Sequence, residues 1–269
     1  MSAVAAGLAT LDRLDRLSRQ QTAVHRIDPR AKVLATAVYI VCVVSFGRYE
    51  VFPLLPFVVF PVVMAAEGNV PFGFLGRVLL AVSPFAIVIG VFNPWFDRDA
   101  VVWIGDLAVS GGWVSFASIL VRFLLTASAA LVLTATTGFL GVCVALRRLR
   151  VPDVFVTQLL LLYRYLFVLG EEALRMGQAR RLRSQGWRGM GLTVYGQMLG
   201  QLLLRTVARA QRVYLAMKCR GFDGEVRVAR RLCFGRADLV FLAVWSALFV
   251  FFRAIDVPGL LGRLVEGVS

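Results

Sequence analysis

The chain has 269 residues, of which 59% are hydrophobic and 17% charged, and its formal net charge is +14. Soluble domains are usually about 45–50% apolar and about 25% charged, so the composition argues against an ordinary soluble domain and indicates a membrane protein. Nucleic-acid binding is one interpretation of so basic a chain. Membrane proteins also concentrate Lys and Arg on their cytoplasmic segments, which explains the charge together with the apolar content.

The first 30 residues form a polar arm. Leucines at positions 11, 14 and 17 are separated by charged residues, a pattern typical of a short amphipathic helix that lies on a membrane surface. The motif HRIDPRAK (25–32) follows, in which Asp28 is expected to be the N-cap and Pro29 the first residue of a helix. Arg30 and Lys32 are then expected to snorkel to the interface.

Four apolar segments lie within residues 31–146, and each is expected to cross the membrane. Their approximate ranges are 31–46, 51–66, 74–92 and 114–140. Pro53, Pro56 and Pro61 predict that the second segment is kinked or broken. Arg122 lies inside the fourth, where a charge is costly. It is either a functional group or a structural arginine that reaches the outer surface or pairs with a loop carboxylate.

The distribution of charge orients these segments. Residues 147–236 carry eighteen Lys and Arg against five Asp and Glu, so residues 147–237 are expected to be cytoplasmic. The N-terminal arm (1–30) has the same bias, and four crossings place both on one side. The poorly basic loop 93–113 then lies outside. A last apolar segment within 238–269 crosses again and leaves an external tail.

Three helical pieces are predicted in the basic region. Residues 154–170 are expected to lie half-sunk in the inner leaflet, and a further crossing is the alternative. Residues 171–185 predict a polar helix with Glu171 and Arg175 paired at i,i+4. Residues 191–218 predict an amphipathic helix. Its apolar stripe comprises positions 195, 199, 202, 206, 210, 213 and 217.

The residues needed for catalysis are not found in the sequence. His25 is the single histidine, the four cysteines form no CxxC pair, and no GxxxxGK[ST] phosphate-binding motif is present. We therefore expect no enzyme activity, no metal site and no cofactor in this chain. A scaffold that docks other subunits fits this inventory.

Two helix ends in the basic region share a form. Arg183 precedes Ser184 and Arg220 precedes Gly221, and each arginine comes just before the helical pattern breaks. Both can be ordinary cations at a helix C-terminus, with Gly221 as a plain C′ glycine. Alternatively, each planar guanidinium pairs with carboxylates on a cytosolic partner.

Three pieces of the sequence carry a resemblance to a known family. They are HRIDPRAKV (25–33), LLYRYLFVLGEEALRMGQARRLRS (161–184) and LAMKCRGFDG (215–224). The sequence resembles the transmembrane component of energy-coupling factor (ECF) transporters, and more closely the cobalt-type CbiQ proteins. Members of this family carry two short sequence motifs, usually written Ala-Arg-Gly or Ala-Arg-Ser. Here the alanine is replaced by Leu182 in the first and by Cys219 in the second.

The resemblance implies an all-α polytopic membrane protein with about five transmembrane helices and a cytoplasmic coupling-helix region. It also implies a multi-subunit importer in the bacterial cytoplasmic (inner) membrane, with the N-terminus of this chain in the cytoplasm. The implied partners are two ATP-binding-cassette ATPases, a membrane-embedded substrate-binding subunit and, in some systems, a small accessory membrane subunit. ATP would bind the ATPases and a cobalt ion the substrate subunit.

By the same resemblance, Arg183, Ser184, Arg220 and Gly221 would contact the ATPases. The supporting residues on the coupling helices would be Glu171, Glu172, Arg175, Arg180 and Met217.

Other functions stay open at this point. A nickel or vitamin importer would use the same scaffold. A self-contained permease would line an aqueous route with Arg122 and Arg164. A membrane-anchored nucleic-acid binder would use residues 175–236, which lack exposed aromatics at stacking spacing.

Overall fold

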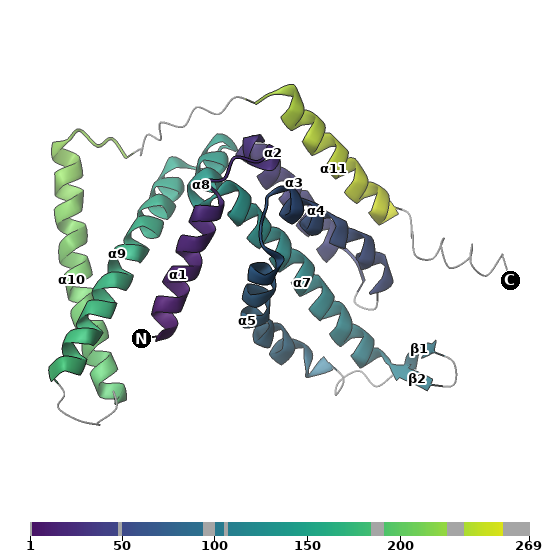
Figure 1. Cartoon of the computed structure of the whole chain (residues 1–269), viewed down its shortest axis with the longest axis horizontal. Coiled ribbons are helices and arrows are strands. Elements are labelled where there is room, and N and C mark those ends of the chain that lie inside the picture. The colour runs from purple at the N-terminus through teal and green to yellow at the C-terminus, as the bar shows by residue number, and fades with distance from the viewer. Residues whose placement is uncertain are drawn as a thin grey trace. The chain divides into compact units, whose positions relative to one another are not determined.

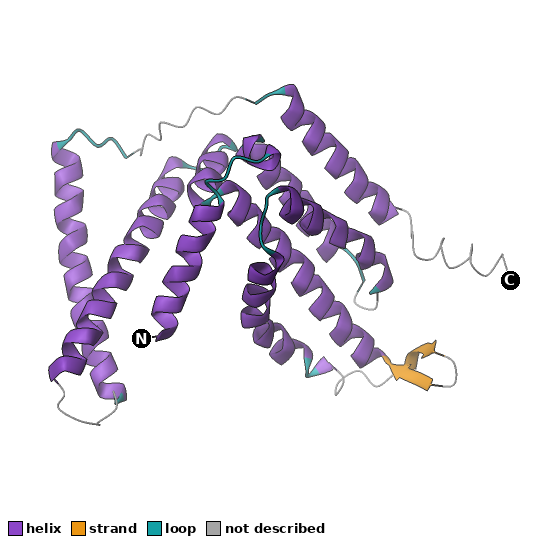
Figure 2. Cartoon of the chain, viewed as in Figure 1, coloured by secondary structure: helices purple, strands orange, loops and turns teal. Residues whose placement is uncertain are grey.

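The computed structural model describes residues 2–47, 50–93, 100–104, 107–183, 191–224 and 234–254. The described chain is mainly α-helical, as predicted, with one short β-hairpin (Figures 1 and 2). It divides into two compact units. We name residues 17–138 with 231–269 the core unit, and residues 1–16 with 139–230 the hairpin unit.

The core unit holds most of the apolar helices. Its elements are α2 (Ala23–Arg26), α3 (Pro29–Val44), the 3-10 helix η1 (Phe52–Val58), α4 (Val59–Glu67), α5 (Phe72–Gly90), strands β1 (Ala100–Ile104) and β2 (Leu107–Ser110), α7 (Gly111–Thr137) and α11 (Arg236–Ala254). The two strands pair antiparallel. The break predicted from the three prolines is present between η1 and α4, because Pro56 cannot donate a backbone hydrogen bond within η1.

Aromatic side chains join the last helix of the core unit to the first ones. Tyr39 of α3 is fully buried and its hydroxyl donates to the Phe57 carbonyl at 3.1 Å. The Phe249 ring of α11 meets the Tyr39 ring edge-on at 5.2 Å between centroids, and the Phe60 ring at 5.1 Å. Edge-to-face pairs of this kind stabilise beyond their buried area. They hold α11 on helices that precede it by about 200 residues.

Polar groups fix the start of α3. Asp28 is the N-cap, as predicted, and its carboxylate accepts from the Arg30 N–H at 2.9 Å. The carboxylate of Asp238, which is buried, accepts from the Asp28 and Gly235 N–H groups, each at 2.7 Å. One carboxylate therefore serves the N-terminal ends of both α3 and α11.

The snorkelling expected of Lys32 is wrong. Its side chain is 1% exposed, and its ammonium donates to the Thr136 carbonyl at 3.1 Å. That carbonyl belongs to the C-terminal turn of α7, where unpaired carbonyls and the negative end of the helix dipole favour a cation. Lys32 therefore ties α3 to α7 instead of reaching the interface.

Arg122 makes its contact near the other end of α3. It donates to the Gly47 carbonyl, just beyond the helix. Arg253 of α11 donates to the Ser45 carbonyl at 3.3 Å and lies 4.6 Å from the centre of the Phe46 ring. Two cations thus meet carbonyls at and just beyond the C-terminal end of α3, which supports the structural interpretation of Arg122.

We expect Asp238→Ala to destabilise the protein by about 1–3 kcal/mol, because the buried Asp28 N–H and the part-buried Gly235 N–H lose their acceptor. Thermal unfolding of the purified protein in detergent measures the effect. Asp12→Asn is the control, since Asp12 is half-exposed and its ion pair with Arg16 lies at the surface. Equal unfolding temperatures for the Asp238 variant and the wild type would refute this account of the helix ends.

Four described helices are long and apolar enough to cross a membrane. They are α5, α7, α11 and α9 (Asp153–Arg183). The segment Phe52–Glu67, which contains η1 and α4, is a shorter apolar stretch. The chain is thus a multi-pass membrane protein. Because α9 also meets the criterion, the helix that contains residues 154–170 is long and apolar enough for the further crossing that was the alternative interpretation.

Four helices are described in the hairpin unit. They are α1 (Ser2–Leu17), α8 (Phe139–Arg148), α9 and α10 (Leu192–Cys219). The predicted division between 154–170 and 171–185 is wrong, because α9 is one continuous helix of 31 residues. Gly170, which was expected to end the first piece, lies within the helix. A Cβ at this position would come within 2.5 Å of the Leu8 side chain, so the glycine permits close packing of α1.

The amphipathic helix predicted for the N-terminal arm is present as α1, but its surroundings differ from the prediction. Leu8 packs against Gly170 of α9, and Leu14 is 7% exposed. Part of its leucine face is thus covered by protein and is not available to a lipid surface.

Candidate functional site

The α9–α10 hairpin carries the residues singled out in the sequence. The two helices run antiparallel (Figure 1), so early residues of α9 lie near the end of α10, and later residues of α9 contact residues nearer its start. Thr157 donates to the Gly224 carbonyl at 3.2 Å near the start of α9, while Glu172 meets Arg205 further along. Arg183, the last residue of α9, therefore lies at the same end of the pair as the start of α10, and Arg220 lies at the same end as the start of α9.

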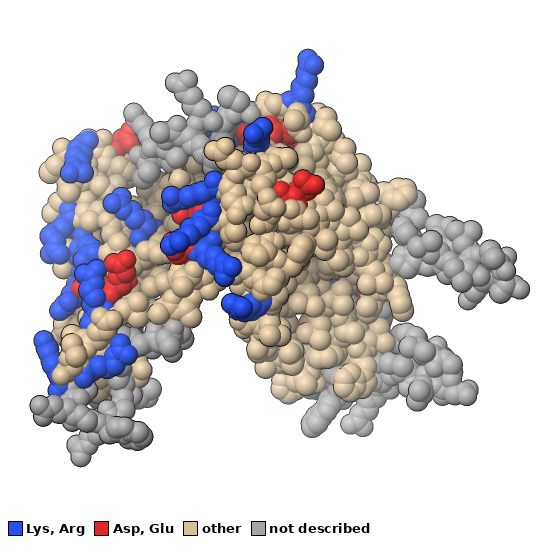
Figure 3. Space-filling model, viewed as in Figure 1, with Lys and Arg blue, Asp and Glu red and all other residues tan. Residues whose placement is uncertain are grey.

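The two arginines are consequently far apart. A helix of 28 residues, the length of α10, extends for about 42 Å. Arg183 and Arg220 thus mark opposite ends of a rod about 40 Å long. On the face shown in Figure 3, Lys and Arg side chains gather over this hairpin.

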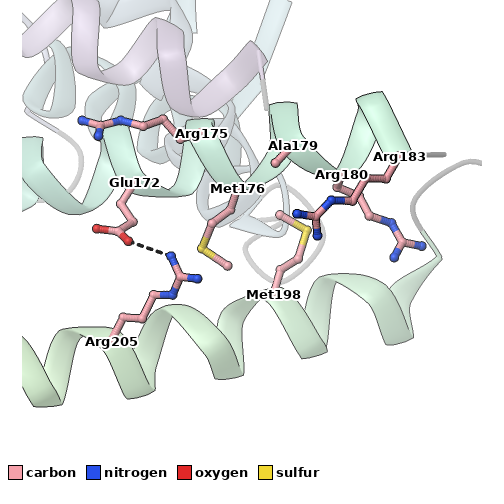
Figure 4. A pocket seen from close by; sticks show the side chains of 8 residues that line it. All are labelled: Glu172, Arg175, Met176, Ala179, Arg180, Arg183, Met198 and Arg205. Carbon is pink, nitrogen blue, oxygen red and sulfur yellow. Dashed lines mark hydrogen bonds and ion pairs between the residues drawn. The ribbon is translucent and has the colours of Figure 1, made fainter.

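A groove lies between the helices at the Arg183 end (Figure 4). Its volume is about 620 Å³, and it is lined by Glu172, Arg175, Met176, Ala179, Arg180, Arg183, Met198 and Arg205. We call it the basic groove. Four arginines against one glutamate give it a strongly positive lining.

Glu172 holds the two helices together. Its carboxylate oxygens pair separately with Arg205 and Arg209 of α10, each at 3.1 Å. The Glu172 side chain is 21% exposed and that of Arg209 38%, so the Glu172–Arg209 pair is less screened than surface pairs, whereas Arg205 is 60% exposed. The predicted pair of Glu171 and Arg175 is confirmed at 3.0 Å, but both side chains are more than 60% exposed, which makes it a weak surface contact.

The Arg220 end has a different chemistry. Arg220 is the C-cap of α10, and Gly221 has φ +78°. The Gly221 N–H donates to the Lys218 carbonyl and the Phe222 N–H to the Met217 carbonyl, both at 3.0 Å. This is a Schellman motif, in which a glycine at C′ avoids the strain of the left-handed conformation.

A second cavity of about 580 Å³ adjoins this end. Apolar side chains from both helices dominate its lining, including Leu161, Leu162, Val213, Met217 and Phe222. Phe222 and Met217 occupy the two positions whose apolar contact accompanies a Schellman motif. We call it the apolar cavity.

The structure separates the predicted site residues into two groups. It brings Glu172, Arg175, Arg180 and Arg183 together in the basic groove, with Glu171 beside them. It places Met217, Arg220 and Gly221 at the opposite end. Ser184 lies outside the described residues.

Several residues of this hairpin were not predicted as site residues. Met176 and Met198 line the basic groove, and Arg205 and Arg209 bind Glu172. The sequence placed the two arginines on the polar face of their helix, opposite the apolar stripe. Nothing in their spacing indicates a partner more than 30 residues away, because that pairing depends on the register between the helices.

The single histidine has a structural position. The His25 Nε2 donates to the Leu17 carbonyl at 3.1 Å, and its Nδ1 accepts from the Thr22 hydroxyl at 2.8 Å. Burial lowers the pKa of His25, so the ring is neutral at physiological pH. Among the described residues, no three His, Cys, Asp or Glu side chains gather where they could hold a metal ion.

These features define a class of protein. Helices apolar and long enough to span a membrane, together with a long helical hairpin that carries many arginines, are those of a multi-pass membrane protein. Residues 20–230 match the family CbiQ, described as cobalt transport protein. The chain belongs to this family.

Individual relatives agree with the family. An uncharacterised protein of Methanocaldococcus jannaschii is 26% identical over 251 residues, which cover 88% of this chain and 85% of that protein. The cobalt transport protein CbiQ of Rhodobacter capsulatus is 37% identical over 97 residues, 36% of this chain and 40% of the relative. The nickel permease LarQ of Lactiplantibacillus plantarum is 32% identical over 122 residues, 44% of each chain.

Proposed function

We propose that this protein is the transmembrane coupling subunit of an ECF-type importer for divalent cobalt. The observation that carries the proposal is the hairpin of α9 and α10, whose two ends present Arg183 and Arg220 about 40 Å apart. Membership of the cobalt transport family supplies the context.

In this function the hairpin transmits motion between subunits. Each arginine binds carboxylates on one of two ATP-binding-cassette ATPases, since a guanidinium pairs bidentately with a carboxylate. The Glu172 pairs with Arg205 and Arg209 hold the helices as one lever. When the ATPases close around ATP, the lever moves and reorients a membrane-embedded substrate-binding subunit.

The cargo binds elsewhere in the complex. Cobalt is bound by the substrate subunit and ATP by the ATPases, and a small accessory membrane subunit can complete the assembly. The hairpin and the N-terminus face the cytoplasm of a bacterium, and the spanning helices lie in its inner membrane. A nickel importer is the second candidate, favoured by the similarity to the nickel permease.

Affinity purification and transport together test the proposal. The tagged chain, expressed with the genes that neighbour its own, should copurify with two ATP-binding-cassette subunits and one further membrane subunit. Cells with the complete set should accumulate cobalt in an ATP-dependent manner, and cells without this chain should not. If this chain alone supports uptake without any ATPase, it is a permease and the proposal fails.

A further inference from the structure

The basic groove contains two cations that the hairpin does not use. Arg175 is paired with Glu171, and Arg205 with Glu172. Arg180 and Arg183 have no hydrogen bond or ion pair to any other residue that the structure describes. They are three residues apart on α9 and therefore neighbours on its surface. Figure 4 shows both guanidinium groups in the space between α9 and α10.

The remainder of the groove is apolar. Met176 and Ala179 of α9 and Met198 of α10 line the same cavity as the two arginines. Methionine side chains adapt to irregular apolar partners. A ligand that fills the groove would therefore present a negative group to the arginines and an apolar group to the methionines.

Glu172 indicates which negative group fits. It demonstrates that a carboxylate is accepted between these helices, with arginine nitrogens at 3.1 Å from both of its oxygens. Its own charge lines the groove as well. A second negative charge close to it is disfavoured, so a carboxylate with one charge fits better than a phosphate with two.

We propose that the basic groove binds an acidic segment of a protein partner, with one carboxylate held jointly by Arg180 and Arg183. A neighbouring apolar side chain of that segment lies between Met176 and Met198. This inference rests on the proposed function and makes Arg180 a second binding residue of that interface. It also gives the Arg183 end a preference for acidic, amphipathic partners.

Peptide binding to the full-length protein tests the proposal. The protein is placed in nanodiscs of zwitterionic lipid, and the probe is a fluorescent peptide of alternating glutamate and leucine. We expect Arg180→Ala and Arg183→Ala each to weaken binding about tenfold, because each removes a charge-assisted contact. Met198→Ala should have a smaller effect. Arg212→Ala is the matched control, since Arg212 is exposed on α10 and does not line the groove.

The outcomes separate the possible ligands. The proposal is supported if the wild type binds the peptide, Arg180→Ala binds it more weakly, and Arg180→Lys has an affinity between those two. The proposal is overturned if the peptide does not bind, if Arg180→Ala binds it as tightly as the wild type does, or if excess inorganic phosphate displaces it. It is also overturned if the protein binds phosphatidylglycerol vesicles in place of the peptide. Copurification of the ATPases is scored separately. If they remain bound to Arg180→Ala and are lost from Arg183→Ala, the coupling function stands and the role of Arg180 falls.

Discussion

Replacing Arg183 and Arg220 together with alanine is expected to abolish cobalt uptake and to leave the protein inserted and folded. Arg183 is exposed at the end of α9, and Arg220 is exposed at the end of α10. Neither ties described elements together as Arg122 or Arg253 does. Each single variant should lose about tenfold to a hundredfold in ATPase association, the effect of removing hydrogen bonds to a charged group.

Transport of labelled cobalt and copurification of the ATPases measure this effect, and thermal unfolding checks the fold. Arg→Lys at either position should restore function only in part, because lysine keeps the charge but lacks the planar fork. Arg212→Ala provides a control of equal charge change on the same hairpin. Normal transport and normal copurification by the double variant would exclude these arginines as the coupling contacts.

The sequence predicted the features of the fold that depend on local chemistry. Asp28 and Pro29 marked the start of α3 because an N-cap carboxylate and a fixed φ act within a few residues. The prolines of the second apolar segment marked the break between η1 and α4 for the same kind of reason. The predicted crossings at 74–92, at 114–140 and within 238–269 coincide with α5, α7 and α11, whose apolar runs are long enough to span. The predicted crossings at 31–46 and 51–66 are not among the described helices of spanning length.

Features that depend on a distant neighbour were not predictable. Gly170 looked like a helix end, and only the presence of Leu8 against it explains why a glycine stands inside α9. Lys32 looked like an interfacial residue, and the carbonyl that receives it belongs to Thr136. In both cases the partner lies more than 100 residues away, so no local pattern contains the information.

The same limit applied to the candidate site. The sequence identified both terminal arginines from their position before a break in the helical pattern. It did not indicate that the two ends differ, because the basic groove and the apolar cavity are each formed by side chains from both helices. The two ends therefore offer different surfaces to their partners, one charged and one apolar, even though their short motifs look alike.

Loss of the Glu172 carboxylate is expected to loosen the hairpin. In Glu172→Ala, Arg205 and Arg209 both lose their partner, and like charges then remain close together on α10. We expect the pairing of α9 with α10 to weaken by about 1 kcal/mol, because both arginines can be solvated once their partner is lost, and cobalt uptake to fall although Arg183 and Arg220 are intact. Faster hydrogen exchange of the α10 amides should accompany the loss.

Glu171→Ala is the matched control for this prediction. Glu171 is the neighbouring residue, carries the same charge and also pairs with an arginine, but its partner Arg175 lies on the same helix and both are exposed. Its loss should change hydrogen exchange and transport little. If Glu172→Ala behaves like Glu171→Ala, the lever does not depend on this carboxylate, and the apolar contacts between α9 and α10 must keep the hairpin together.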